Sequence, residues 1–209
     1  MNENNLCSIN EPYKGSGQLT REQFLFHETR TTAGLLLKGM DDQAIIEQIY
    51  CDNLFQYPTK KSLRRVARGC LVRIHGLKDV SLARALAEEN VGTAKQVCLY
   101  SMMIQYRLMW DFMITVIGAK YRQQDFTYSR RDINLFFMRL REQSNIVASW
   151  SESTVRRIGS LLSKILVENG YIDNGKAEAL NPVLISPILE KAIRESGQEI
   201  ALPAFNCLS

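Results

Sequence analysis

The sequence predicts a mainly α-helical protein. Hydrophobic residues make up 45% of the 209 residues and charged residues 23%, which is typical of a folded chain with a sizeable core. Apolar residues recur at the three- and four-residue spacing of amphipathic helices. Ser, Thr, Asp and Gly stand where such helices should start and stop. We therefore expect one large or two small helical domains.

The first expected helix follows a polar N-terminal stretch. Residues 1–19 are polar and contain glycines, so we expect a flexible arm there. Thr20 and Gln23 have the spacing of a capping box, which predicts that a helix begins here. It should run to about Lys38, because Gly39 is a natural stop.

Two more helices are expected up to residue 76. The segment MDDQAIIEQIYCDNLF predicts a helix capped by Asp41 or Asp42. Pro58 then breaks the chain, and Thr59 is placed to cap a basic helix. Gly76 should end that helix.

A long apolar stretch lies near the middle of the chain. A short helix capped by Ser81 should precede a longer one from about Thr93, which includes residues 97–118. The length of this stretch suits a bilayer, but Arg107 and Asp111 near its centre would each cost about 2.5–3.5 kcal/mol there. These two residues can pair four apart on a helix. We expect a central core helix, with a membrane span as the minor alternative.

Two further helices follow a break near residues 118–125. The segment SRRDINLFFMRLREQ predicts the first of them. Ser149 and Glu152 have capping-box spacing and predict the start of the second. Gly170 should end it as a C′ residue.

The last part of the chain carries a turn signal. Asn174-Gly175 is a strong β-hairpin signal, with YID and KAEALNPVLIS as the strands. Ser186 should cap a last helix that has Pro187 as its first residue. Helix, helix and β-hairpin in this order are typical of a winged helix-turn-helix. The expected organisation is a flexible arm at residues 1–19, a helical bundle at 20–124 and a winged-helix-like region at 125–209.

The expected helix after Pro58 is strongly basic. The stretch from residue 57 to residue 76 holds six Lys or Arg residues and no acid, in a chain of formal net charge +4. On a helical wheel five cations share an arc of about 140°, and Arg73 lies off its edge. Acids of another element or a polyanion must compensate these charges, so a solvated face stays the alternative. The candidate DNA-binding residues of this helix are Lys60, Lys61, Arg64, Arg65, Arg68 and Arg73.

The expected helix after Ser149 has a second polar face. Its first turn offers free N–H groups to phosphate, and arginine can reach guanine edges in a major groove. A plain amphipathic helix is the alternative, and Glu152 and Glu168 count mildly against DNA. The candidate DNA-binding residues here are Ser153, Thr154, Arg156, Arg157, Ser160 and Lys164, with Lys176 at the hairpin tip.

Motifs of the common enzyme classes are missing from the sequence. There is no phosphate-binding GxxxxGK[ST], no HExxH and no GxSxG. The five cysteines contain no CxxC, and with only two histidines they predict no zinc site. We expect no catalytic site, no cofactor, no metal and no small-molecule substrate. The polar start and the free thiols favour the cytoplasm.

Three stretches together resemble the BrxA proteins of BREX phage-defence systems, a family once described as inner-membrane proteins. They are HETRTTAGLLLKGM, DNLFQYPTKKSLRRVARGCLVRIHGL and VASWSESTVRRIGSLLSKILVENGYID. The last is similar to the family's Trp-x-Glu-Ser-Thr run, here from Trp150 to Thr154. The resemblance extends from about Leu19 to the C-terminus.

The resemblance implies a NusB-like helical bundle followed by a winged-helix region. It implies a non-enzymatic accessory protein that binds double-stranded DNA with little sequence preference, and other BREX proteins as further partners. The residues that it indicates are Arg64, Arg68, Ser153, Thr154 and Arg156.

Two other functions stay open at the level of sequence. A NusB-like protein with a cationic helix could bind RNA, although aromatic residues for stacking single strands do not interleave the basic run. The basic faces could instead dock on acidic surfaces of larger defence proteins.

Overall fold

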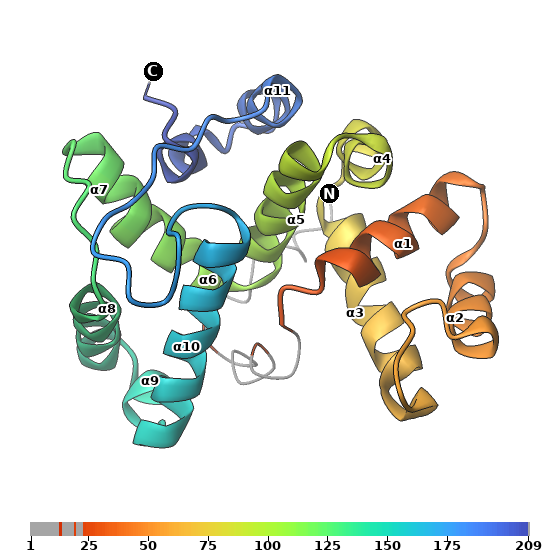
Figure 1. The fold of residues 1–209 in the computed structure, drawn as a ribbon, viewed down its shortest axis with the longest axis horizontal. Coiled ribbons are helices and arrows are strands. Elements are labelled where there is room, and N and C mark those ends of the chain that lie inside the picture. The colour runs from red at the N-terminus through yellow and green to blue at the C-terminus, as the bar shows by residue number, and fades with distance from the viewer. Residues whose placement is uncertain (1–12, 14–18, 20–22, 209) are drawn as a thin grey trace, which may run out of the picture. The chain divides into compact units, whose positions relative to one another are not determined.

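The computed structural model describes residues 13, 19 and 23–208 and is mainly helical, as expected (Figure 1). The described part of the chain contains no β-strand. The expected arm and Thr20 fall largely outside it. The helices are α1 (Phe26–Leu37), α2 (Asp42–Asp52), α3 (Leu63–Gly76), α4 (Val80–Glu88), α5 (Val91–Gln105), α6 (Arg107–Phe112), α7 (Ala119–Arg122), α8 (Arg130–Gln143), α9 (Asn145–Ala148), α10 (Glu152–Glu168) and α11 (Pro187–Glu195). Further helical segments are the 3-10 helix η2 (Lys60–Ser62), the π-helical η3 (Met113–Gly118) and the 3-10 helix η4 (Glu199–Phe205).

Contacts divide the chain into two compact units. The α1–α5 unit contains residues 24–105 and residues 185–197, which carry α11. The α6–α10 unit contains residues 106–184 and 198–208 with the described residues before Phe24. The sequence-based boundary after residue 124 follows from motifs and stays a prediction.

The apolar stretch at 97–118 is not one helix, so that expectation was wrong. α5 ends at Gln105, and Tyr106 has extended backbone angles (φ −122°, ψ 108°) before α6 begins. The two halves of the stretch are buried in different units, which the uniform apolar pattern could not indicate. Within the described ranges, no helix is both long enough and apolar enough to cross a membrane.

The ion pair expected within this stretch is present. Arg107 Nε donates a hydrogen bond to Asp111 at 2.9 Å. The hydroxyl of Tyr13 donates to the same carboxylate at 2.7 Å, and Tyr13 is itself buried. Burial and this carboxylate raise the pKa of Tyr13. Tyr13 is therefore held on α6 through a charged pair.

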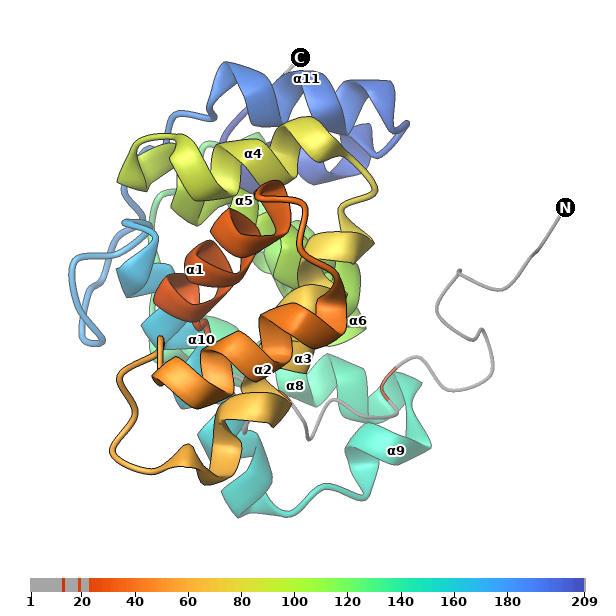
Figure 2. The same cartoon turned by 90° about the vertical axis from the view of Figure 1, so that its right-hand side faces the viewer.

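The core of the α1–α5 unit lies where α1, α2 and α3 meet (Figure 2). The apolar residues Ile49, Leu63 and Ala67 fill it without exposure to solvent. Cys70 lies in the same cluster, and burial raises the pKa of its thiol to about 11. The four described cysteines are free thiols, as expected.

Several helix ends lie where the sequence predicts. Asp41 caps α2, with its side chain accepting the N–H of Ala44 at 2.9 Å. Gly39 and Gly170 have φ angles of 79° and 74° and end α1 and α10, because glycine tolerates this region without strain. Pro187 is the first residue of α11.

The starts of α1 and α3 differ from the prediction. α1 begins at Phe26, so Gln23 lies outside the helix instead of completing a capping box. Thr59 makes no side-chain cap, and the chain passes through η2 before α3 starts. The side chain of Ser186 likewise makes no cap at α11.

Two further caps are shifted by two residues. Asp79 instead of Ser81 caps α4, accepting the N–H of Ser81 at 2.7 Å. Ser151 instead of Ser149 caps α10. The hydroxyl of Ser149 donates to a carbonyl of α9, because the chain is still turning there. Where several capping residues cluster, local sequence does not select between them.

The predicted β-hairpin is wrong, and with it the wing of the predicted winged helix. Asn174-Gly175 does form a turn, closed by two hydrogen bonds to Asn174. The returning chain then pairs elsewhere: the N–H of Leu180 donates to the carbonyl of Phe126 at 2.7 Å. Within the described chain, the only isolated β-bridge joins Thr127 and Ala179 in antiparallel orientation. The turn signal was local, whereas the pairing partner is more than 40 residues away.

A substitution at Gly118 should test the close approach of η3 and η4. A Cβ there would lie 3.0 Å from the backbone nitrogen of Ala204 and 3.2 Å from the carbonyl carbon of Pro203. Backbone atoms yield less than side-chain ends, so Gly118→Ala should lower the free energy of unfolding by about 1–3 kcal/mol. Gly34→Ala in α1 is the control, since its Cβ meets no atom within 4 Å. It should raise stability by up to about 1 kcal/mol in urea unfolding. Equal changes in the free energy of unfolding for the two variants would contradict the close approach of η3 and η4 at Gly118.

Candidate nucleic-acid interface

α3 turns one apolar side to the core and its cations outward. Leu63, Ala67, Cys70 and Ile74 are buried at spacings of three and four residues. The amphipathic pattern expected from the sequence is therefore confirmed for this helix.

Two of the candidate cations on this face already make hydrogen bonds within the chain. Arg64 forms two hydrogen bonds with Glu47 of α2, at 2.8 and 3.1 Å, and lies 3.5 Å over the ring of Tyr50. This hydrogen-bonded guanidinium holds the pKa of Glu47 below its ordinary value. Lys60 donates to the carbonyl of Cys51 at 2.9 Å. An acid of another element thus compensates part of the basic face.

The remaining cations form a row. Lys61, Arg65 and Arg68 are exposed, and none makes a hydrogen bond or ion pair with another described residue. Arg65 and Arg68 are three residues apart and lie on one side of α3, and Lys61 precedes them in η2. We call these three residues the α3 row.

Arg73 is not part of any surface, which corrects its assignment to DNA binding. Its side chain is 0% exposed, and Nη1 donates to the carbonyl of Phe24 at 2.9 Å. Arg73 lies off the arc of the other cations because it faces the interior.

α10 carries a second row of cations. Arg156, Arg157 and Lys164 are exposed and make no ion pair with any acid in the described chain. The opposite side of the helix, with Ile158 and Leu162, is buried. We call the three cations the α10 row.

The candidate hydroxyl residues lie beside this row. Ser153 is exposed, and its hydroxyl lies 2.9 Å from that of Ser151. The hydroxyl of Thr154 lies 3.0 Å from Ser151, and that of Ser160 donates to the carbonyl of Arg156 at 2.9 Å. Local partners hold these hydroxyls, and each keeps further acceptor capacity.

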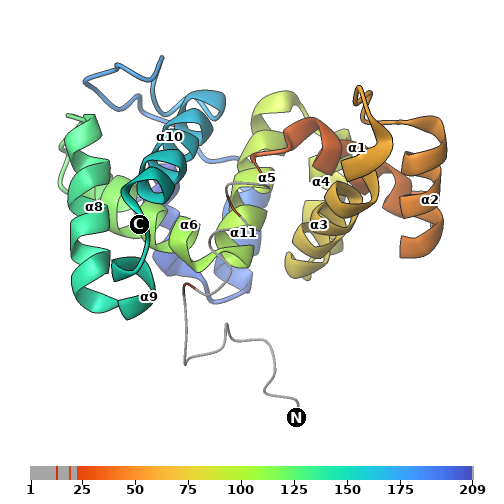
Figure 3. The same ribbon diagram turned by 90° about the horizontal axis from the view of Figure 1, so that it is seen from below.

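An ion pair covers the start of α10. Arg141 of α8 lies 2.7 Å from the carboxylate of Glu152 and reaches the carbonyl of Trp150 at 3.4 Å. The helices α8 and α10 lie side by side (Figure 3). The acid that counted against DNA binding at this helix end is therefore neutralised. Lys176 is exposed in the loop after α10, close to the Asn174 turn in sequence.

Sequence reasoning missed the residues that pair with the candidate cations or with the acid beside them. Glu47 accepts a hydrogen bond from Arg64, and the ring of Tyr50 lies under the same guanidinium. Arg141 donates to the carboxylate of Glu152. Helical spacing does not relate Glu47 to Arg64, so no pattern within one helix could have found this pair. No group of three or more metal-ligating side chains occurs in the described residues.

Sequence comparisons connect the chain to one family. A sequence model described as BrxA matches residues 12–197. The BREX protein BrxA of Bacillus cereus (strain H3081.97) is 32% identical over 178 residues, covering 84% of this chain and 88% of that protein. The BREX protein BrxA of Escherichia coli O9:H4 (strain HS) is 27% identical over 183 residues, covering 88% and 85%.

A solved structure shows the same fold. The chain is similar to a crystal structure of an uncharacterized protein from Magnetospirillum magneticum, with a TM-score of 0.74 and 22% identity. The match covers 90% of this chain and 96% of that one.

Proposed function

The chain belongs to the BrxA family, and we propose that it is a non-enzymatic accessory protein of a BREX phage-defence system that binds double-stranded DNA. Relatives named BREX protein BrxA support the place in defence. The exposed charges support the binding of phosphates with little sequence preference. Other BREX proteins are the further partners that this place implies.

The α10 row is the observation that carries the DNA proposal. Three like charges on one helix repel one another unless an anion neutralises them. No acid among the described residues pairs with them, and Arg141 neutralises the nearby Glu152. Arginine also offers two parallel N–H donors to a phosphate. Duplex DNA supplies a regular array of such acceptors, and Lys176 adds a cation from the loop after the helix.

The α3 row is a second phosphate-binding surface in this proposal. Lys60 and Arg64 add positive charge next to the row, while part of their donors already bond to the carbonyl of Cys51 and the carboxylate of Glu47. The strongest phosphate contacts should therefore come from Lys61, Arg65 and Arg68.

The salt dependence of DNA binding tests the proposal. Fluorescence anisotropy with a labelled duplex would give log K against log salt, with a slope of about −2.7 for three neutralised phosphates and about −5.4 for six. We expect a value within this range, the larger one if both rows bind at once. A slope near zero, or no binding at low salt, would overturn DNA binding. A single-stranded RNA that outcompetes the duplex would support the RNA alternative instead.

A further inference from the structure

One side of α2 holds two cations of the basic face. Glu47 accepts two hydrogen bonds from the guanidinium of Arg64, at 3.1 Å from Nε and 2.8 Å from Nη2. The ring of Tyr50 lies under the same guanidinium, with 3.5 Å from Cζ to the ring centroid, and Lys60 lies 5.3 Å over this ring. The carbonyl of Cys51 accepts a hydrogen bond from Lys60. Glu47, Tyr50 and Cys51 share one side of α2 by their spacing, and we call these three residues the α2 cradle.

The carboxylate of Glu47 binds Arg64 in the way that a phosphate would. Two parallel N–H···O bonds from one guanidinium are the usual arrangement with either anion. The bonded groups are still reachable from solvent, since 40% of the Arg64 side chain and 42% of the Glu47 side chain are exposed. An ion pair this exposed is weak, because water and salt screen it. A phosphate of bound DNA can therefore displace Glu47 from the same two donors.

The charge of Glu47 also acts on the α3 row. Arg64 precedes Arg68 by four residues, so the two lie on the same side of α3. The hydrogen bonds from Arg64, and more weakly the charge of Arg68, lower the pKa of Glu47. The carboxylate thus stays ionised at neutral pH, and its field extends to Arg68. A phosphate that approaches the α3 row meets this negative charge.

We propose that Glu47 weakens the binding of duplex DNA to α3 by competing with phosphate for Arg64. In the free chain Arg64 stays in the α2 cradle, and the α3 row alone faces outward without a bonded acid. A phosphate contact through Arg64 requires the pair with Glu47 to break, which offsets part of the attraction. This inference rests on the proposed function, because it assigns the residue that limits the affinity of that same surface.

Removal of the carboxylate tests the competition. Glu47→Gln keeps the length of the side chain and removes its charge. It should raise the affinity for a labelled duplex about three- to tenfold near about 0.1 M salt. The slope of log K against log salt should become steeper by about 0.9, which corresponds to one further phosphate contact. Fluorescence anisotropy over a salt series measures both quantities.

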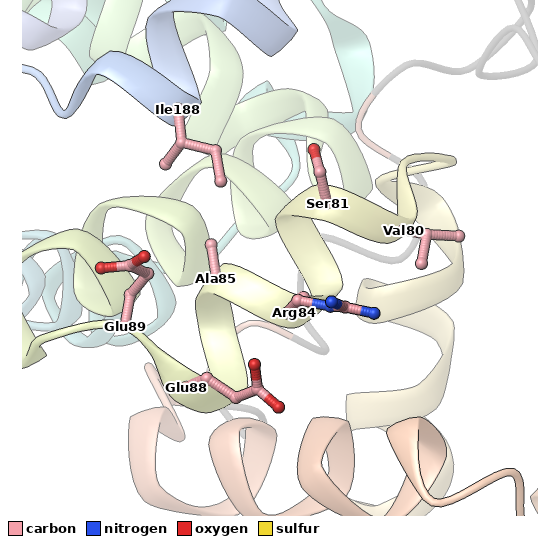
Figure 4. A pocket seen from close by; sticks show the side chains of 7 residues that line it. All are labelled: Val80, Ser81, Arg84, Ala85, Glu88, Glu89 and Ile188. Carbon is pink, nitrogen blue, oxygen red and sulfur yellow. The ribbon is translucent and has the colours of Figure 1, made fainter.

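Glu88→Gln is the matched control for the change in net charge. Glu88 is exposed on α4, beside a groove of about 350 Å³ that Arg84 and Ile188 also line (Figure 4). It makes no hydrogen bond or ion pair with another described residue. Its replacement removes the same charge without releasing a bonded arginine, so the affinity should change by less than about twofold.

Dependence on Arg64 separates the release of this guanidinium from a general gain in positive charge. The double variant Glu47→Gln/Arg64→Ala removes both members of the pair and leaves the net charge as in the wild type. It should bind with the wild-type affinity and slope, because the gain of Glu47→Gln comes through Arg64. Both side chains are partly exposed, so neither substitution should unfold the chain. A gain that persists in the double variant would refute the competition for Arg64.

The sign of the Glu47→Gln effect decides between competition and orientation. Weaker binding by this variant would show that Glu47 orients Arg64 toward the DNA, and binding equal to that of Glu88→Gln would show that Glu47 has no special part. Either result rejects the competition but leaves DNA binding in place. If the wild type itself shows no salt-dependent binding, the proposed function fails, and the competition fails with it.

Discussion

Alanine at Arg156, Arg157 and Lys164 should lower the affinity for duplex DNA by roughly two orders of magnitude near about 0.1 M salt. Each lost phosphate contact removes about 0.9 from the slope of log K against log salt, so the triple variant should lose about 2.7. The three side chains are exposed and unpaired among described residues, so their truncation should leave the fold intact. Anisotropy over a salt series measures both quantities.

The α3 row provides the matched control for this experiment. Alanine at Lys61, Arg65 and Arg68 removes the same three charges, so any difference between the triple variants reflects position and not net charge. Equal losses of slope would show that both rows contact phosphates. A loss of slope confined to the α3 variant would show that the α3 row, and not the α10 row, contacts the DNA phosphates. Unchanged slopes in both variants would contradict phosphate binding by either row.

Several helix ends and the buried side of α3 were predictable, because they depend on neighbours in sequence. Asp41 caps α2 and Gly170 ends α10 through bonds within one or two turns. The buried side of α3 follows from its three- and four-residue spacing. These features need no knowledge of the rest of the chain.

Features set by distant segments were not predictable in the same way. The break at Tyr106 carries no Gly or Pro, and it occurs where the chain passes between two units. The chain after Asn174-Gly175 pairs with Phe126, and no local signal indicates that partner. Of the candidate site, the exposed rows were predicted correctly as outward cations, whereas Arg64 needed the position of Glu47 to be understood.

Arg73 shows that one helix can hold two kinds of arginine. Arg68 is exposed, and Arg73 on the same helix is fully buried, with Nη1 donating to Phe24. Burial of a guanidinium is costly unless hydrogen bonds satisfy it, so its neighbours must be arranged around it. The bond to Phe24 fixes the chain just before α1 against α3.

Arg73→Ala should therefore lower the free energy of unfolding by about 3–4 kcal/mol, because it leaves a cavity and removes the guanidinium donor from the carbonyl of Phe24, which then keeps only the weak thiol donor of Cys98. Arg73→Met fills most of the volume and should cost about 1–3 kcal/mol for the lost donor. Urea unfolding measures both.

Comparison with Arg68→Ala decides whether Arg73 stabilises the core or binds phosphate. That variant should change stability by less than about 0.5 kcal/mol and remove about 0.9 from the salt slope of DNA binding. The folded Arg73→Met protein should keep the wild-type slope. If it instead loses about one unit of slope with little loss of stability, Arg73 reaches phosphate after all, and its place in the core is the wrong account of this residue.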